Sequence, residues 1–423
     1  MKATTNKLLR PGLWAPAVLI GLSLFLAVAP PAQAQAGGPT LLSGVAQVDF
    51  PLKLTFGVSA RSDVPISDIR LRYRVEQEAF ADVTSEEQLA FTPGTSVEAS
   101  VSLDLLRIGG LPPGVVFDYW WRITDSGGAI TETSPTSVTF SDNRYTWSRL
   151  DGDNLSIFWY QGGDAFAREL MQSATEGLAQ LSADTGAILD RPVDIYIYAS
   201  TADLQGAMVY PSEWTGGATY PRFSTIVIGV SPVQLDWGKG AVIHELTHMV
   251  NHQMTRNPYA GVPVWLDEGL ATYAQGLPSP AFTTALYQAV RNGTLISVRS
   301  LSSPFSALSD QANLSYAESY SIVSFLLERY GPAKMLELLG TFRQGNTYDG
   351  ALEQVFGFDT EGLDSLWRSY VRDQYVPSSS SSPTSATGGK GRPAPVAALL
   401  ILSLSLPGGL GIMFVKRRRA VRL

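Results

Sequence analysis

The sequence predicts a multidomain chain: an all-β sandwich, then an α+β domain, then a single transmembrane helix near the C-terminal end. Three observations predict this order. Short segments of alternating apolar residues fill the N-terminal third, mixed strand and helix patterns follow them, and residues 396–415 form an apolar segment without a charge. A chain of 423 residues is long enough for two or three domains, each with its own core.

The composition excludes several classes of protein. The 31 basic and 38 acidic residues give a net charge of −7, which argues against a nucleic-acid partner because such proteins normally carry a basic face. The absence of cysteine excludes disulfide scaffolds, cysteine-ligated zinc, iron–sulfur clusters and thiol catalysis. The 3 histidines all lie between positions 244 and 252, so histidine chemistry is confined to one short segment.

Residues 1–36 have the pattern of a signal peptide. Basic residues near the start precede an apolar stretch over 14–29, and small residues at 32–36 provide a cleavage pattern after Ala34 or Ala36. An uncleaved anchor helix is the alternative. A cleaved signal peptide would place the rest of the chain outside the cytoplasm.

The segment 394–415 is predicted to be the transmembrane helix, because its apolar part is long enough to cross a bilayer. Basic residues follow it directly, so the positive-inside rule makes 416–423 a cytoplasmic tail. Residues 377–393, rich in Ser, Pro and Gly, are predicted to be a flexible stalk. A cleaved sorting signal would look similar, but no sorting pentapeptide is recognisable. We therefore expect a single-pass protein of the cell membrane whose main body is extracytoplasmic.

Residues 40–145 are predicted to form the β-sandwich. Apolar and polar residues alternate at 69–75 and 117–124, which is typical of antiparallel strands, and 125–128 is a turn signal. In the second strand one face is apolar and aromatic: Phe117, Tyr119, Trp121 and Ile123. The pattern resembles fibronectin type III or immunoglobulin-like modules, without the disulfide of the latter. A spacer role is the simplest expectation for this module.

Residues 146–376 mix strands and helices. Strands are predicted at 194–198 and 224–230, which are rich in β-branched residues and tyrosine. Apolar spacings of three and four predict helices at 164–183, 239–253, 266–275, 314–330 and 333–343. If the strand 224–230 lies at a sheet edge, it could align an extended peptide, and a buried core strand is the alternative.

An H-E-x-x-H motif occupies residues 244–248 on a predicted helix. The spacing of four places His244 and His248 on one helix face, one turn apart, so both imidazoles can reach one ion. Glu245 lies beside them, where it can contact a water on the ion without being a ligand. Zinc takes such nitrogen and oxygen ligands in a tetrahedral arrangement. A chance match is the alternative to a zinc site.

The third ligand decides the subclass of the predicted zinc site. The extended metzincin pattern requires histidine at position 254, but the residue is Met254, so that pattern fails. Glu268 lies far enough downstream for the motif helix to end, turn, and return antiparallel with a carboxylate at the ion. The alternative is that Asp267 and Glu268 are an acidic pair favoured by the dipole at a helix N-terminus.

The two motifs, His-Glu-Leu-Thr-His at 244–248 and Trp-Leu-Asp-Glu-Gly-Leu-Ala at 265–271, resemble the gluzincin zinc metallopeptidases of clan MA. The resemblance covers roughly 150–375 and is best with the bacterial peptidase MA-like domain group. It implies a zincin-like metallopeptidase fold. It also implies one Zn²⁺ per chain on His244, His248 and Glu268, with Glu245 as general base and acid.

The resemblance also bears on the group that stabilises the oxyanion. In zinc aminopeptidases, a tyrosine that begins a Tyr-Glu-Lys-Gly segment has this role. Tyr316 begins Tyr-Ala-Glu-Ser in this chain, which departs from that segment after its first residue, and Tyr320 follows one turn later. Packing of both tyrosines is the alternative. His252, one turn beyond the second histidine of the motif, is expected to be a supporting or surface group.

The sequence thus predicts a membrane-anchored, extracytoplasmic zinc metallopeptidase with a peptide or protein substrate and a lipid bilayer as partners. Two alternatives stay open: a non-catalytic surface binding module with a structural zinc site, and a zinc amidohydrolase acting on a non-peptide substrate. Glu245 argues against the first, because a structural site has no need of that carboxylate. Endopeptidase and aminopeptidase activity are not distinguished.

Overall fold

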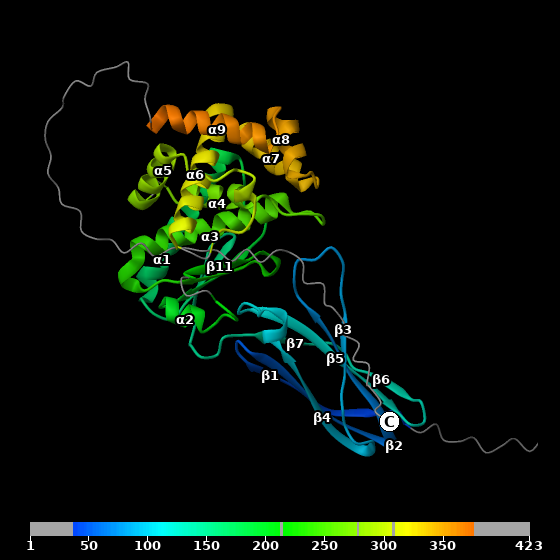
Figure 1. Cartoon of the computed structure of the whole chain (residues 1–423). Helices are drawn as coiled ribbons and strands as arrows, with labels where there is room; N and C mark the ends of the chain where they lie inside the picture. Colours follow the sequence, from blue (N-terminus) through cyan, green and yellow to red (C-terminus); the bar gives the residue numbers. More distant parts are fainter. Residues whose placement is uncertain (1–36, 212–214, 277–278, 307–308, 376–423) are drawn as a thin grey trace, which may run out of the picture. The chain divides into compact units, whose positions relative to one another are not determined.

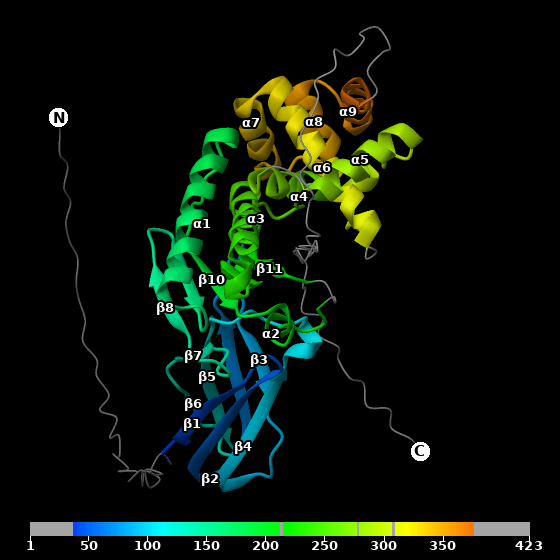
Figure 2. The same ribbon diagram turned by 90° about the vertical axis from the view of Figure 1, so that its left-hand side faces the viewer.

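The computed structural model describes residues 37–211, 215–276, 279–306 and 309–375 (Figures 1 and 2). The predicted signal peptide, stalk, transmembrane segment and cytoplasmic tail lie outside these residues. Along the described chain, an antiparallel sheet comes first, a mixed sheet follows, and helices dominate the rest.

The N-terminal strands form one seven-stranded antiparallel sheet, which we call sheet A. Its strands are β1 (Thr40–Asp49), β2 (Lys53–Val75), β3 (Ser85–Gln88), β4 (Gly94–Asp104), β5 (Val115–Asp125), β6 (Ile130–Glu132) and β7 (Thr136–Phe140), with a 3₁₀ turn at Leu105–Ile108. The first half of β2 pairs with β1 and β4, and its second half pairs with β3 and β5. The sheet curls over itself, so the rings of Phe56 and Tyr119 lie 4.8 Å apart.

This arrangement corrects the predicted sandwich of two sheets. The sequence Ser-Asp-Val-Pro at 62–65 has the composition of a turn, yet the chain stays extended there. The pairing register of β2 with β4 shifts between Arg61 and Ile66, which is how a bulge bends a strand without ending it. One long strand, β2, therefore runs through both halves of the curled sheet instead of ending at a turn between two sheets. The alternation predicted for 117–124 is confirmed, because its apolar face is buried, but the likeness to fibronectin or immunoglobulin modules is not.

The second sheet, sheet B, is mixed and five-stranded. Its strands are β8 (Ser148–Asp151), β9 (Leu155–Trp159), β10 (Val193–Tyr198), β11 (Gly217–Tyr220) and β12 (Thr225–Gly229). They lie in the order β11-β12-β10-β9-β8, with β9, β10 and β12 parallel and the two outer strands antiparallel to their neighbours. The predicted strand 224–230 is therefore internal, and β11 holds the edge position beside it.

Helices complete the described chain. They are α1 (Gly163–Thr185), α2 (Thr201–Gln205), α3 (Leu235–Thr255), α4 (Val264–Ala274), α5 (Pro280–Asn292), α6 (Ser309–Tyr330), α7 (Pro332–Arg343), α8 (Tyr348–Phe356) and α9 (Thr360–Tyr375), with 3₁₀ turns at Pro221–Phe223, Pro232–Gln234 and Ser300–Ser302. The apolar sides of α1 and α3 pack on sheet B, and α4 to α9 share a separate core around Trp265 and Trp367. Five helices match the sequence prediction, whereas α2, α5, α8 and α9 were not predicted.

The predicted fold class also included a transmembrane helix at 394–415, and this part stays a prediction. Among the residues that the structure describes, no helix combines the length and the apolar character needed to cross a membrane. Helices α1 and α6 have 23 and 22 residues, but both carry charged residues along their length. The segment 394–415 itself lies outside the described residues. The observed architecture is a curled sheet followed by a mixed sheet with a large helical layer.

Candidate metal centre

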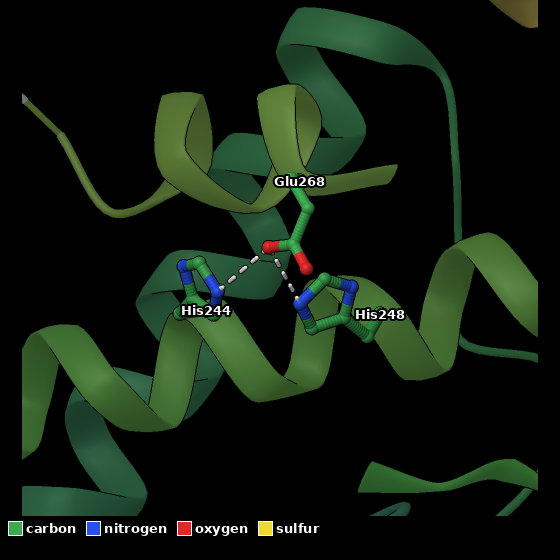
Figure 3. A group of neighbouring side chains, drawn as sticks. All are labelled: His244, His248 and Glu268. Atoms are coloured by element: carbon green, nitrogen blue, oxygen red, sulfur yellow. Dashed lines mark ion pairs between the residues drawn. The ribbon is translucent and has the colours of Figure 1, made fainter. Parts of the chain in front are cut away.

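The three predicted ligands gather at one point between α3 and α4 (Figure 3). One ligand atom from each of His244, His248 and Glu268 lies within 4.8 Å of the others. Oε2 of Glu268 is 3.6 Å from Nε2 of His244 and 3.5 Å from Nε2 of His248. All three residues are buried. The geometry therefore places two imidazoles and one carboxylate around a single position that an ion could occupy.

The chain between the two motifs makes this arrangement. Helix α3 ends at Thr255, and the side chain of Asn257 holds the turn by accepting the N–H groups of Tyr259 and Ala260. Helix α4 then returns alongside α3. Gly269 lets α4 approach α6, since a Cβ there would lie 2.5 Å from the carbonyl oxygen of Ser319. The close packing of α4 on α6 thus explains why a glycine follows Glu268.

Asp267 supports His248 from the side away from the ion position. Its Oδ2 lies 2.9 Å from Nδ1 of His248, and its Oδ1 accepts a hydrogen bond from Asn251 at 2.8 Å. A carboxylate on the far nitrogen fixes the tautomer and orientation of a metal-binding imidazole. Asp267 also lies in the first turn of α4, where the helix dipole favours a carboxylate, so both explanations apply to it. Asn251 was not singled out from the sequence, because no motif marks it.

The electrostatics of the cluster favour a bound cation. Burial lowers the pKa of His248, but the carboxylates of Asp267 and Glu268 raise it by more, to about 10 in the metal-free protein. Nε2 of neither histidine makes a hydrogen bond with any described residue. Two imidazole nitrogens and a carboxylate oxygen are a donor set that zinc accepts while keeping a fourth position open. The residues present therefore fit a zinc ion.

Glu245 lies beside the ligands on α3 and is completely buried. Its Oε2 accepts a hydrogen bond of 2.7 Å from the hydroxyl of Thr219 on β11. Burial raises the pKa of Glu245 in the metal-free protein, and His248 and His244 oppose this rise. A carboxylate with a raised pKa and a nearby cation site has the properties of a general base.

Of the two tyrosines considered, Tyr316 is the one near the cluster. Its ring is buried between Phe282 and Phe305, at centroid distances of 6.1 and 5.2 Å. Burial, followed by the charges of Glu268 and Glu245, raises the pKa of Tyr316 well above its usual value, so the hydroxyl stays protonated. Tyr320 instead stacks on Tyr273.

His252 does not join the ligand group. Its Nε2 lies 3.6 Å from Oε2 of Glu78, a residue in the loop that follows β2 of sheet A. Glu78 also pairs with Arg256 at 2.7 Å and with Arg191. The third histidine therefore belongs to a charged contact between α3 and the end of sheet A.

One family of known proteins matches the region that contains this centre. Residues 173–373 match the family model of the Peptidase MA superfamily. The chain is 11% identical to an M1 zinc metallopeptidase from Deinococcus radiodurans, over 78% of this chain and 94% of that one, with a TM-score of 0.29. It is 12% identical to Legionella pneumophila aminopeptidase A in complex with aspartic acid, over 78% of this chain and 50% of that one, with a TM-score of 0.33. Structural likenesses this low establish nothing by themselves, and no curated protein matches. The family match, together with the two histidines and the glutamate, supports a metallopeptidase.

Proposed function

We propose that this chain is a zinc metallopeptidase that hydrolyses peptide bonds, with one zinc ion held by His244, His248 and Glu268. The observation that carries the proposal is the buried cluster of two imidazoles and a carboxylate beside a second buried carboxylate, Glu245. The family match over 173–373 supports it. When bound, zinc polarises a carbonyl group and lowers the pKa of a coordinated water to about 7.

The side chains around the centre supply the proton transfers. Glu245 accepts the proton of the attacking water and then delivers it to the leaving nitrogen. Its Oε1 is the oxygen for this task, because it makes no hydrogen bond to any described residue whereas Oε2 is held by Thr219. The protonated hydroxyl of Tyr316 donates to the oxyanion that develops on the scissile carbonyl.

We infer that the substrate backbone lies along β11. This strand lies at the edge of sheet B, so one of its sides pairs with no described strand. An extended peptide can add to such an edge as a further strand. A Cβ on Gly217 of the same strand would lie 2.7 Å from Oε1 of Glu245. A peptide on β11 would therefore pass the general base.

The alternatives differ in what they require of Glu245. A structural zinc site needs only its ligands and gives no reason for a second carboxylate, Glu245, buried beside them. An amidohydrolase acting on a non-peptide substrate would use the same centre. Profiling a peptide library with purified residues 37–376 distinguishes the proposed peptidase from this amidohydrolase, because the amidohydrolase would leave peptides intact.

The test of the mechanism is Glu245→Gln. The amide cannot accept the proton, so turnover of library peptides should fall by about a hundred- to ten-thousand-fold while zinc content and melting temperature stay unchanged. Tyr316→Phe should be milder, since it removes one oxyanion donor worth about 3 kcal/mol. Wild-type turnover by a zinc-loaded Glu245→Gln protein would overturn the proposed function.

We also propose that this catalytic region works outside the cytoplasm and is held at the cell membrane. The signal-peptide pattern at 1–36 and the apolar segment followed by the basic tail 416–423 support this location. Protease added to intact cells should release a soluble fragment by cutting within 377–393. Complete protection of the catalytic region would contradict it.

A further inference from the structure

We infer that Thr219 is a positioning residue for Glu245: its hydroxyl fixes one carboxylate oxygen so that the other is presented for proton transfer. The inference rests on the proposed function and deepens it. Thr219 Oγ1 lies 2.7 Å from Oε2 and 3.1 Å from the backbone oxygen of Glu245. A hydroxyl has one proton to donate. The carboxylate oxygen Oε2 is the nearer and the stronger acceptor, so it receives this proton.

The opposite oxygen of Glu245 is constrained by space instead of a hydrogen bond. Residues 217 and 219 lie two apart on β11 and so face the same side of the strand. A Cβ on Gly217 would come within 2.7 Å of Oε1 and 3.1 Å of Cδ. The glycine thus leaves room for Oε1, and the threonine two residues later holds Oε2.

The strand that carries these contacts is itself anchored. In the β11–β12 ladder Gly217 pairs with Ile228 and Thr219 pairs with Ile226, and both isoleucines are buried beneath α3. The Thr219 side chain is buried as well. The hydroxyl therefore approaches the carboxylate from a fixed position. A carboxylate on a long side chain has rotamer freedom that costs rate when it is unrestrained, and this contact removes that freedom.

The decisive comparison is Thr219→Val with Thr219→Ser. Valine keeps the shape and loses the hydroxyl, so kcat on library peptides should fall about ten- to a hundredfold with KM nearly unchanged. Serine keeps the hydroxyl and should retain kcat within about threefold of the wild type, while both variants keep their zinc. Thr341→Val is the matched control, because it removes another buried hydroxyl, bonded to the backbone oxygen of Glu337 on α7.

A structural readout makes the test independent of turnover. In crystals of metal-free Thr219→Val, the Glu245 carboxylate should rotate away from its wild-type orientation, and in Thr219→Ser it should keep it. Gly217→Ala is the second variant if valine at 219 prevents folding, since its methyl group should displace the same carboxylate. An unrotated carboxylate, or equal losses of kcat in the valine and serine variants, would overturn the inference.

The Glu245→Gln variant distinguishes a failure of the positioning role of Thr219 from a failure of the proposed function. If Glu245→Gln is inactive and Thr219→Val has wild-type kcat, only the positioning role is wrong. If Glu245→Gln retains turnover, the proposed function is wrong, and the orientation of Glu245 in the Thr219 variants then decides the positioning role alone.

Discussion

A cluster of ion pairs on sheet A and two carboxylates of the helical region lie in opposite environments. On sheet A, Arg72 pairs with Glu86 at 2.8 Å and with Glu132 at 3.0 Å, and all three stay partly in water. In the helical region, Glu245 and Glu318 are completely buried. Surface pairs add little to a fold that apolar residues already hold, whereas buried carboxylates cost free energy unless something compensates them. The difference indicates which charged groups contribute little to stability and which need a compensating partner.

The two buried carboxylates are compensated differently. Glu245 lies beside a cluster that fits a cation, and His248 and His244 favour its charged form. Oε1 of Glu318 accepts a hydrogen bond from the N–H of Ile296, and Oε2 has no hydrogen-bond partner among the described residues. Burial raises the pKa of Glu318 from 4.5 to about 8, against the opposing effects of that N–H and Arg368. At neutral pH a bound proton neutralises Glu318, whereas a bound cation would compensate the charge of Glu245 at the metal centre.

Removing a buried ligand should have the largest effect. We expect Glu268→Ala to lower the zinc content of residues 37–376 from about one per chain to less than about a tenth, because two imidazoles alone hold zinc poorly. Chelation should lower the melting temperature of the wild type, since a ligand at a thousand times its Kd stabilises by about 4 kcal/mol. It should have little effect on Glu268→Ala. Metal analysis and calorimetry measure both.

The matched control for this prediction lies on sheet A. Glu86→Ala removes a carboxylate of the same kind from a partly exposed ion pair and should leave zinc content unchanged. Undiminished zinc in Glu268→Ala would show that the third ligand is misassigned, and His248→Ala would then identify the remaining ligands.

The sequence predicts much of the metal centre because the relevant distances are short along the chain. A spacing of four on a helix places His244 and His248 together whatever the rest of the fold does. Glu268 needed only one turn between two helices. Thr219 could not be found in this way, because β11 reaches Glu245 through the pairing of a sheet, which no local pattern records. Asn251 lies on α3 itself, but its contact with Asp267 depends on how α3 and α4 pack.

Sheet A shows the same limit at the level of the fold. Alternation correctly predicts which face of 117–124 is buried, because the period of a strand is a local property. It does not report which strands pair. The composition of 62–65 indicates a turn, and only the pairing of β2 with β4 and then with β5 shows that the strand continues.

Glu318→Gln should produce the next largest effect, on stability. Because the folded pKa of about 8 exceeds the ordinary 4.5, the folded wild type holds more protons than the unfolded chain between these values. Its free energy of unfolding should therefore fall as pH rises from about 4.5 to about 8, by on the order of a few kcal/mol. The glutamine variant keeps the acceptor for Ile296 and should lose this dependence.

Urea unfolding of metal-free protein at a series of pH values measures the Glu318 effect. Glu328→Gln is the control, since Glu328 lies on the same helix, is exposed, and accepts a hydrogen bond from Tyr370. If wild type and Glu318→Gln show the same slope with pH, the buried carboxylate is ionised in the folded protein and the contrast with sheet A fails at this site.

Glu86→Gln should have the smallest effect, with the opposite dependence on pH. The hydrogen bonds from Arg70 and then Arg72 lower the pKa of Glu86, so its contribution is present above the ordinary pKa of a glutamate and is lost as pH falls through the lowered value. Because the pair is partly exposed, the variant should lose only about 0.2–1 kcal/mol at pH 7, and less at high salt. Glu98→Gln, an exposed carboxylate on β4 with no ion pair among the described residues, is the control. A loss of several kcal/mol in Glu86→Gln would mean that sheet A also depends on its partly exposed ion pairs, and their contrast with the buried carboxylates would not hold.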